Sequence, residues 1–143
     1  MKQSYAILCV LLAGLMTLSC AKEKEKEVVP PVDFYLVIDT SGSMARGTMK
    51  RVKEKLPALL DSVREGDRIH LLQFDEKPQT IGEYTIRSAE DRRTVEKAIL
   101  DLKPSGPYTD IKQLIAYLKV KTRSANSSAK RYIVVLSDGI DDP

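Results

Sequence analysis

The chain has 143 residues, the length of a single domain, and 43% of them are apolar, which is enough to build a buried core. Its 23 basic and 20 acidic residues give a net charge of +3, and the two signs are mixed along the chain. No block of Lys and Arg interleaved with aromatic residues stands out, and the sequence has no Trp. This composition argues against a nucleic-acid-binding protein.

Residues 1–19 have the pattern of a secretory signal peptide. Lys2 is followed by an uncharged, largely apolar run over residues 5–18, which is shorter than the ~20 residues that a membrane-spanning helix needs. The run leads to the small residue Ser19, and Cys20 comes next. This arrangement resembles the lipobox of bacterial lipoproteins, in which the Cys after the cleavage site is acylated, although the two residues before Ser19 depart from that pattern. An ordinary cleaved signal with a chance Cys and a short transmembrane anchor are the alternatives.

Residues 20–32 are expected to carry the lipid and to form a charged tether. The chain has two cysteines, and Cys9 lies in the segment that would be removed, so Cys20 would carry the lipid and no disulfide would form. The rest of the segment alternates Lys and Glu and ends near two prolines, a composition that cannot bury a core. We therefore expect a protein of the bacterial cell envelope, lipid-anchored to a membrane and facing the periplasm or the surface, with its folded domain at residues 33–143.

Strand and helix patterns alternate through the folded domain. Apolar runs predict strands, and apolar residues at spacings of three and four predict helices. In chain order we expect a strand at 34–39, a helix at 48–63, strands at 68–74 and 79–86, a helix from Ser88 to just before Pro104, a helix at 109–120 and a strand at 131–136. This order predicts an α/β fold with a largely parallel sheet.

Three local signals refine these elements. Pro57 lies inside the helical pattern of residues 48–63, so it should kink that helix or mark its true start. Gly82 should weaken the strand at 79–86, which we expect at an edge of the sheet. Ser88, with Asp91 three residues later, resembles a capping box at the start of a helix.

Five oxygen-bearing side chains are expected at one edge of the sheet. Asp39 and Asp138 each follow an apolar strand, and ligands bind beyond the carboxyl ends of the strands in parallel sheets. Ser41 and Ser43 follow Asp39 at a spacing of two, which in an extended segment aims all three oxygens at one point. Thr109 opens a helix after a loop. Such oxygen ligands suit Mg²⁺, Mn²⁺ or Ca²⁺, whereas Zn²⁺ prefers nitrogen or sulfur. A Ser-Gly pair before a helix is also common as a turn and N-cap, so the motif alone leaves that alternative open.

Three segments, "DFYLVIDTSGSM", "SGPYTDI" and "IVVLSDGIDD", together resemble the motif segments of the von Willebrand factor A domain. The resemblance covers about residues 33–143. It implies a Rossmann-like three-layer sandwich with a mainly parallel central sheet. It also implies a metal-ion-dependent adhesion site that holds Mg²⁺ or a similar ion.

The resemblance assigns a role to each of the five side chains. By position, Ser41, Ser43 and Thr109 would bind the metal through their hydroxyls. Asp39 and Asp138 would act largely through bound water or neighbouring contacts. A Glu or Asp carboxylate of a protein partner would fill the open coordination position, so the resemblance implies a binding protein and not an enzyme.

The sequence departs from the family at its C-terminal end. Family members have a six-stranded sheet, with further helices and strands after the segment that matches "LSDG". Here the sequence stops at Pro143, five residues beyond Asp138. The resemblance therefore implies an incomplete domain: a fragment, a truncated reading frame, or half of something completed by a partner. If the family's strand order applies, the strand at 131–136 becomes a bare apolar edge, which is an aggregation liability.

Two other classes of function are alternatives. The chain also resembles haloacid-dehalogenase-like phosphotransferases, which end a first strand on a nucleophilic Asp and carry an acidic segment like "DGIDD" at 138–142. Those enzymes have a second Asp two residues after the nucleophile as the general acid/base, and here that position is Ser41. The other alternative is an envelope scaffold or assembly module whose metal site is vestigial.

Overall fold

The computed structural model describes residues 29–124 and 129–139, so the expected signal peptide, Cys20 and most of the tether lie outside the described residues. The elements are, in chain order, β1 (Val32–Asp39), the 3-10 helix η1 (Gly42–Arg46), α2 (Thr48–Asp61), β2 (Arg68–Phe74), β3 (Gln79–Thr85), α3 (Ala89–Leu100), α4 (Ile111–Ser124) and β4 (Lys130–Leu136).

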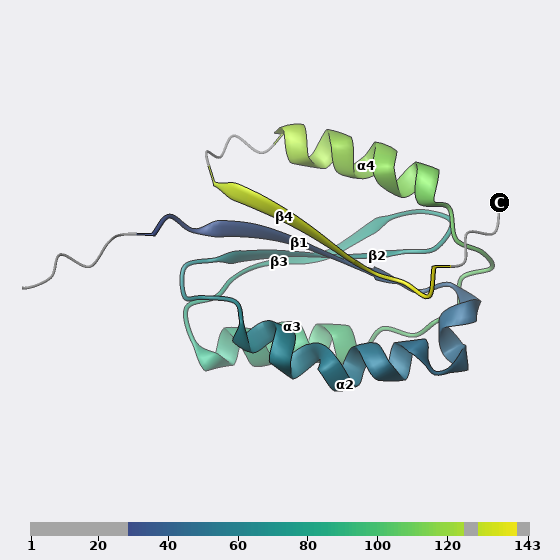
Figure 1. Cartoon of the computed structure of the whole chain (residues 1–143), viewed down its shortest axis with the longest axis horizontal. Helices are drawn as coiled ribbons and strands as arrows, with labels where there is room; N and C mark the ends of the chain where they lie inside the picture. The colour runs from purple at the N-terminus through teal and green to yellow at the C-terminus, as the bar shows by residue number, and fades with distance from the viewer. Residues whose placement is uncertain (1–28, 125–128, 140–143) are drawn as a thin grey trace, which may run out of the picture.

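The described strands form one sheet in the order β3-β2-β1-β4. β1 pairs in parallel with β2 on one side and with β4 on the other, while β3 runs antiparallel to β2. Helix α4 covers one face of this sheet, and α2 and α3 cover the other, which gives three layers (Figure 1). The structure thus confirms the predicted α/β sandwich with a mainly parallel central sheet.

β1 is the centre of the core because its side chains are buried on both faces. Leu36 and Ile38 belong to the apolar cluster under α2 and α3, whereas Tyr35 and Val37 belong to the cluster under α4. The period of two in a strand sends alternate residues to opposite faces, so a strand covered on both sides must be apolar at nearly every position. This explains why the run in residues 34–38 does not alternate with polar residues.

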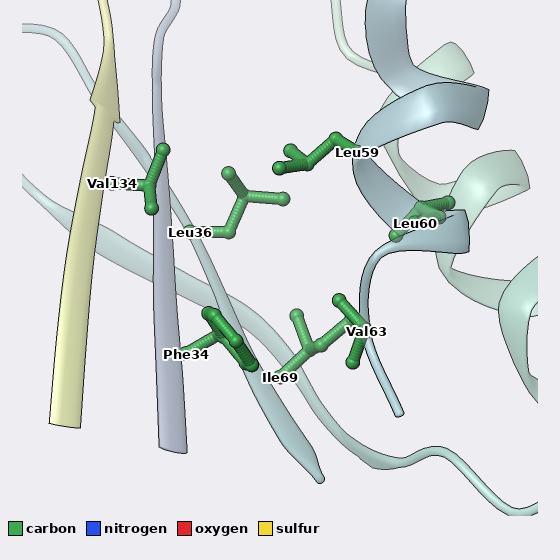
Figure 2. A pocket seen from close by; sticks show the side chains of 7 residues that line it. All are labelled: Phe34, Leu36, Leu59, Leu60, Val63, Ile69 and Val134. Carbon is green, nitrogen blue, oxygen red and sulfur yellow. The ribbon is translucent and has the colours of Figure 1, made fainter. Parts of the chain in front are cut away.

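A small apolar cavity lies between the sheet and the end of α2. It has a volume of about 10 Å³ and is lined by Phe34, Leu36, Leu59, Leu60, Val63, Ile69 and Val134. Figure 2 shows these side chains converging from β1, β2 and β4 on one side and from the α2 region on the other. The lining offers no polar partner for a water molecule, so we regard this cavity as an imperfection of core packing and not as a binding site.

The local signals in the sequence have mixed outcomes. Ser88 caps α3 as predicted, since its hydroxyl accepts a hydrogen bond from the Asp91 N–H at 3.3 Å. Pro57 does not mark a helix start, because α2 begins at Thr48 and continues past it. The helix begins there because Gly47 has a φ of 110°, a conformation that glycine adopts readily and that ends η1. At Gly82 the pairing register between β2 and β3 shifts, which agrees with a weakened edge strand.

β4 lies at the other edge of the described sheet, as expected. Three apolar side chains of this strand remain about half exposed: Tyr132 at 51%, Ile133 at 50% and Val135 at 46%. Tyr132 stacks on Phe34 of β1 with ring centroids 5.6 Å apart. Within residues 29–124 and 129–139, no helix is long and apolar enough to cross a membrane.

Candidate metal centre

The carboxyl end of β1 brings three of the expected side chains together. Asp39 is fully buried and Ser41 is 2% exposed. The Ser41 N–H donates to Asp39 Oδ1 at 2.8 Å, and the hydroxyls of Ser41 and Ser43 lie 3.0 Å apart. A carboxylate and two hydroxyls therefore form one connected group immediately after the strand.

The extended conformation expected for this segment is wrong at Ser43. Ser41 is extended, with φ −63° and ψ 159°, but the 3-10 helix η1 begins at Gly42 and contains Ser43. The turn of η1, which is anchored by the fully buried Met44, brings the Ser43 hydroxyl back toward Ser41. The two hydroxyls meet because of a turn, and not because of the period of a strand.

Thr40, between these residues, fixes the position of the group. Its N–H donates to the Phe74 carbonyl at the end of β2 at 2.8 Å. Its own carbonyl accepts from the N–H groups of Ser105 and Gly106, at 2.9 and 3.0 Å. The Gly42 N–H in turn donates to the Gly106 carbonyl at 2.8 Å. These bonds attach the 105–106 loop to the end of β1, and sequence reasoning missed them because backbone groups leave no signature in a sequence.

Thr109 lies in that loop and is 1% exposed. The helix expected from 109 begins two residues later, because the Asp110 carboxylate accepts the Gln113 N–H at 2.9 Å and so caps α4. The Asp110 N–H donates to the Asp75 carbonyl, just beyond β2, at 3.0 Å. The loop is thus held at the same end of the sheet as Asp39. Within the part of the chain that is described, no hydrogen bond joins the Thr109 hydroxyl to either serine.

Asp138 follows β4, one strand away from Asp39, and it is partly buried. The residue before it contacts the group, since the Ser137 hydroxyl donates to Asp39 Oδ2 at 2.6 Å. Sequence reasoning missed Ser137. The signal was present, since Ser137 is the small hydroxyl residue directly before Asp138 in "VVLSDG".

The donor set fits a hard divalent cation. Across residues 29–124 and 129–139, no cluster of three or more His, Cys, Asp or Glu side chains could hold a metal ion. The group at the end of β1 differs from such a cluster, because it combines one buried carboxylate, that of Asp39, with the hydroxyls of Ser41 and Ser43. Oxygen donors of this type are the ligands that Mg²⁺, Mn²⁺ and Ca²⁺ accept. His70 takes no part, since it lies within β2 and stacks on Tyr35 at a centroid distance of 4.4 Å.

A sheet with β1 at its centre, three helices on its two faces and a hydroxyl-rich loop at the end of β1 defines the class of protein. Residues 34–140 match the von Willebrand factor type A domain, so the chain belongs to this family. Domains of this family are in general interaction modules. Membership favours a binding function over the haloacid-dehalogenase-like alternative.

Individual relatives extend the comparison. An uncharacterized protein of Treponema pallidum is 28% identical over 137 residues, which cover 92% of this chain and 60% of the relative. The von Willebrand factor domain of the type V pilus tip protein Mfa5 from Porphyromonas gingivalis is 25% identical, with a TM-score of 0.57 and coverage of 80% of this chain and 40% of that structure.

A third relative contains a metal. Proximal thread matrix protein 1 from the mussel byssus, solved with zinc in its MIDAS motif, is 16% identical, with a TM-score of 0.62 over 80% of this chain and 32% of its own. MIDAS stands for metal-ion-dependent adhesion site. At this identity the likeness shows the fold alone. In all three cases the chain spans less than two thirds of the relative.

Proposed function

We propose that this domain binds a divalent cation at the carboxyl end of β1 and, through it, a Glu or Asp carboxylate of a protein partner. Ser41, Ser43 and Thr109 would hold the ion through their hydroxyls. Asp39 and Asp138 would support it through bound water or neighbouring contacts. We favour Mg²⁺, with Mn²⁺ and Ca²⁺ as substitutes.

One observation carries the proposal: the Ser41 and Ser43 hydroxyls lie 3.0 Å apart beside the buried carboxylate of Asp39. Burying an ionised carboxylate is costly unless it is both hydrogen-bonded and paired with a cation. Asp39 has two hydrogen bonds, from Ser41 and Ser137, but no cationic side chain is found bonded to it among the described residues. A bound cation would supply the missing charge.

The choice of ligands also favours binding of an acidic partner. Serine and threonine hydroxyls are neutral, so a site with few direct carboxylates leaves most of the ion's charge uncompensated. When bound, the ion would attract an incoming carboxylate as a Lewis acid. The relative that is named as a pilus tip protein supports an adhesive role.

The chain before the domain would place it at the cell envelope. We propose that residues 1–19 are a signal peptide, that Cys20 is lipidated and begins a charged tether ending at residue 32, and that residues 33–143 form the domain. Metabolic labelling with a radioactive fatty acid tests this proposal. Label should enter the wild-type chain and not a Cys20→Ser variant, whereas equal labelling of the two would contradict it.

The metal proposal is tested by isothermal titration calorimetry of the full chain in detergent, first freed of metal with EDTA. Mg²⁺ should bind with a stoichiometry of one, and Ser43→Ala should weaken binding by about tenfold or more, since it removes a ligand. Ser62→Ala is the matched control. Its hydroxyl also makes one hydrogen bond, to the Leu59 carbonyl, but at the end of α2. Mn²⁺, Ca²⁺ and Zn²⁺ titrations give the metal preference.

The carboxylate is tested separately on the Mn²⁺-loaded chain. A short peptide containing Glu should lower the water-proton relaxivity of the bound Mn²⁺, because its carboxylate replaces a water ligand, and the same peptide with Gln should not. No metal binding at all would leave the envelope scaffold as the better interpretation. Metal binding without any response to the Glu peptide would contradict the proposed mode of partner recognition.

A further inference from the structure

We infer that Ser137 is a positioning residue of the metal centre, which orients the Asp39 carboxylate from the neighbouring strand. This inference rests on the proposed function of the site. It concerns a side chain that is not among the five residues proposed to form the metal centre. Ser137 would act through Asp39 and would not touch the ion.

The hydrogen-bond geometry gives Ser137 a defined direction. The Gly139 N–H donates to Ser137 Oγ at 3.1 Å, so this oxygen already serves as an acceptor. The Ser137 proton then goes to Asp39 Oδ2, with an oxygen–oxygen distance of 2.6 Å. A distance this short is typical of a hydroxyl that donates to an ionised carboxylate. The bonds run in one direction, from the backbone after β4 to the carboxylate of Asp39 at the end of β1.

Asp39 is held at two points by two separate parts of the chain. Oδ1 accepts from the Ser41 N–H at 2.8 Å, within its own loop, and Oδ2 accepts from Ser137, which is 98 residues away in sequence. Two bonds to different oxygens fix the plane of a carboxylate, whereas one bond leaves it free to rotate. Each oxygen keeps a further lone pair that can face the ion or its water.

Burial makes the second bond difficult to replace. Asp39 is fully buried, so bulk water cannot take the place of the Ser137 hydroxyl without a change in the surrounding structure. Supporting groups of this kind commonly change metal affinity by about 10- to 100-fold when they are removed. Without Ser137, we therefore expect the ion to bind a carboxylate that has lost its fixed orientation.

The test compares Ser137→Thr with Ser137→Val in the full chain. The two side chains have nearly the same shape, but only threonine keeps the hydroxyl. We expect Ser137→Thr to bind Mg²⁺ within about threefold of wild type and Ser137→Val to bind it about tenfold or more weakly by calorimetry. In EDTA we expect Ser137→Val to melt a few degrees below Ser137→Thr, because the buried Asp39 carboxylate loses one hydrogen-bond donor. Ser137→Ala repeats the hydroxyl removal without a branched side chain, in case the added methyl groups disturb the fold.

The outcomes separate this inference from the proposed function. If the wild-type chain binds Mg²⁺ and the valine and alanine variants bind it equally well, the role of Ser137 is overturned and the metal site is not. Wild-type chain that binds no metal would overturn both. If all three variants lose the same metal affinity and also melt equally lower than wild type in EDTA, position 137 matters only for folding and the inference is overturned.

Discussion

Gly106→Ala should disturb the packing of the 105–106 loop at the proposed metal centre without removing any of the proposed ligands. A Cβ placed at residue 106 would lie 2.3 Å from Asp75 Cβ and 2.6 Å from its Oδ2. Contacts below 3.0 Å do not persist in folded proteins, and Asp75 Cβ cannot rotate away because it is attached to the backbone. The 105–106 loop must therefore move away from β2, and it carries Thr109 with it.

The cost follows from what the loop would lose. Three backbone hydrogen bonds attach residues 105 and 106 to residues 40 and 42, at 2.8 to 3.0 Å. At about 1 kcal/mol each they contribute about 3 kcal/mol to the free energy of unfolding. Restricting the unfolded chain by replacing Gly with Ala returns about 0.4–1 kcal/mol. We expect a net loss of about 2 kcal/mol and, because Thr109 is displaced, a Mg²⁺ affinity lower by about tenfold.

Gly42→Ala is the matched control, because Gly42 lies across the same hydrogen bond. A Cβ there would meet only the Gly106 carbonyl oxygen at 3.4 Å, an ordinary contact. We expect its stability to change by no more than about 0.5 kcal/mol. Urea unfolding in EDTA, followed by far-UV circular dichroism, measures both variants, and calorimetry gives their Mg²⁺ affinity. Equal stability and equal affinity of the two variants would refute the steric argument.

Two further changes test the charged contacts of the fold. Asp67→Ala should lower the free energy of unfolding, measured by urea titration, by about 3 kcal/mol. The buried Asp67 carboxylate accepts hydrogen bonds from the N–H groups of Val32 and Arg64, at 2.9 and 3.0 Å, and both groups would lose their acceptor. A loss below about 1 kcal/mol would contradict this. The hydrogen bond from Lys121 lowers the pKa of Glu83 below its ordinary value of 4.5, against a smaller rise from partial burial. A carboxyl group with a lowered pKa in the folded state contributes stability at pH values above its unfolded-state pKa. This contribution is lost as the pH falls through the folded-state pKa. The free energy of unfolding, measured from about pH 6 downward, should therefore fall more steeply below about pH 4.5 in wild type than in Glu83→Gln. The same pH dependence in both proteins would contradict a stabilising Lys121–Glu83 contact.

The sequence predicted the elements well because their signals are local. The apolar run of β1 and the spacing of apolar residues in α2 each indicate an element directly, and the Ser88 cap confirms that a short polar pattern can mark a helix start. The order of strands and helices was then sufficient for the mainly parallel sheet, since crossover connections leave few alternatives. The errors lie at element ends, such as the start of α4 at Ile111 instead of Thr109, where an aspartate cap decides the boundary.

The candidate site could be predicted only in part, because its parts are joined by contacts distant in sequence. Asp39, Ser41 and Ser43 are close in sequence and were found together, although the turn at η1 was not foreseen. Thr40 acts through its backbone, and Ser137 acts through a bond to a residue 98 positions away. The backbone contacts of Thr40 have no pattern that a single sequence displays. Ser137 was visible as the hydroxyl residue before Asp138, but only the pairing of β1 with β4 shows that it reaches Asp39.

The exposed edge of β4 should make the chain self-associate, and one substitution should relieve it. Ile133 is 50% exposed on β4, at an edge of the described sheet, and an apolar side chain on an edge strand favours pairing with another chain. Ile133→Lys should lower the concentration-dependent association seen by light scattering, because a charge on an edge strand opposes pairing. Ile115→Lys is the matched control, since Ile115 is 47% exposed but lies on α4. If both variants reduce association equally, exposed apolar area drives it and the strand edge does not. If only Ile133→Lys reduces it, the edge strand β4 is the cause, and a partner that covers this edge would lie close to Ser137 and the proposed metal centre at the end of the same strand.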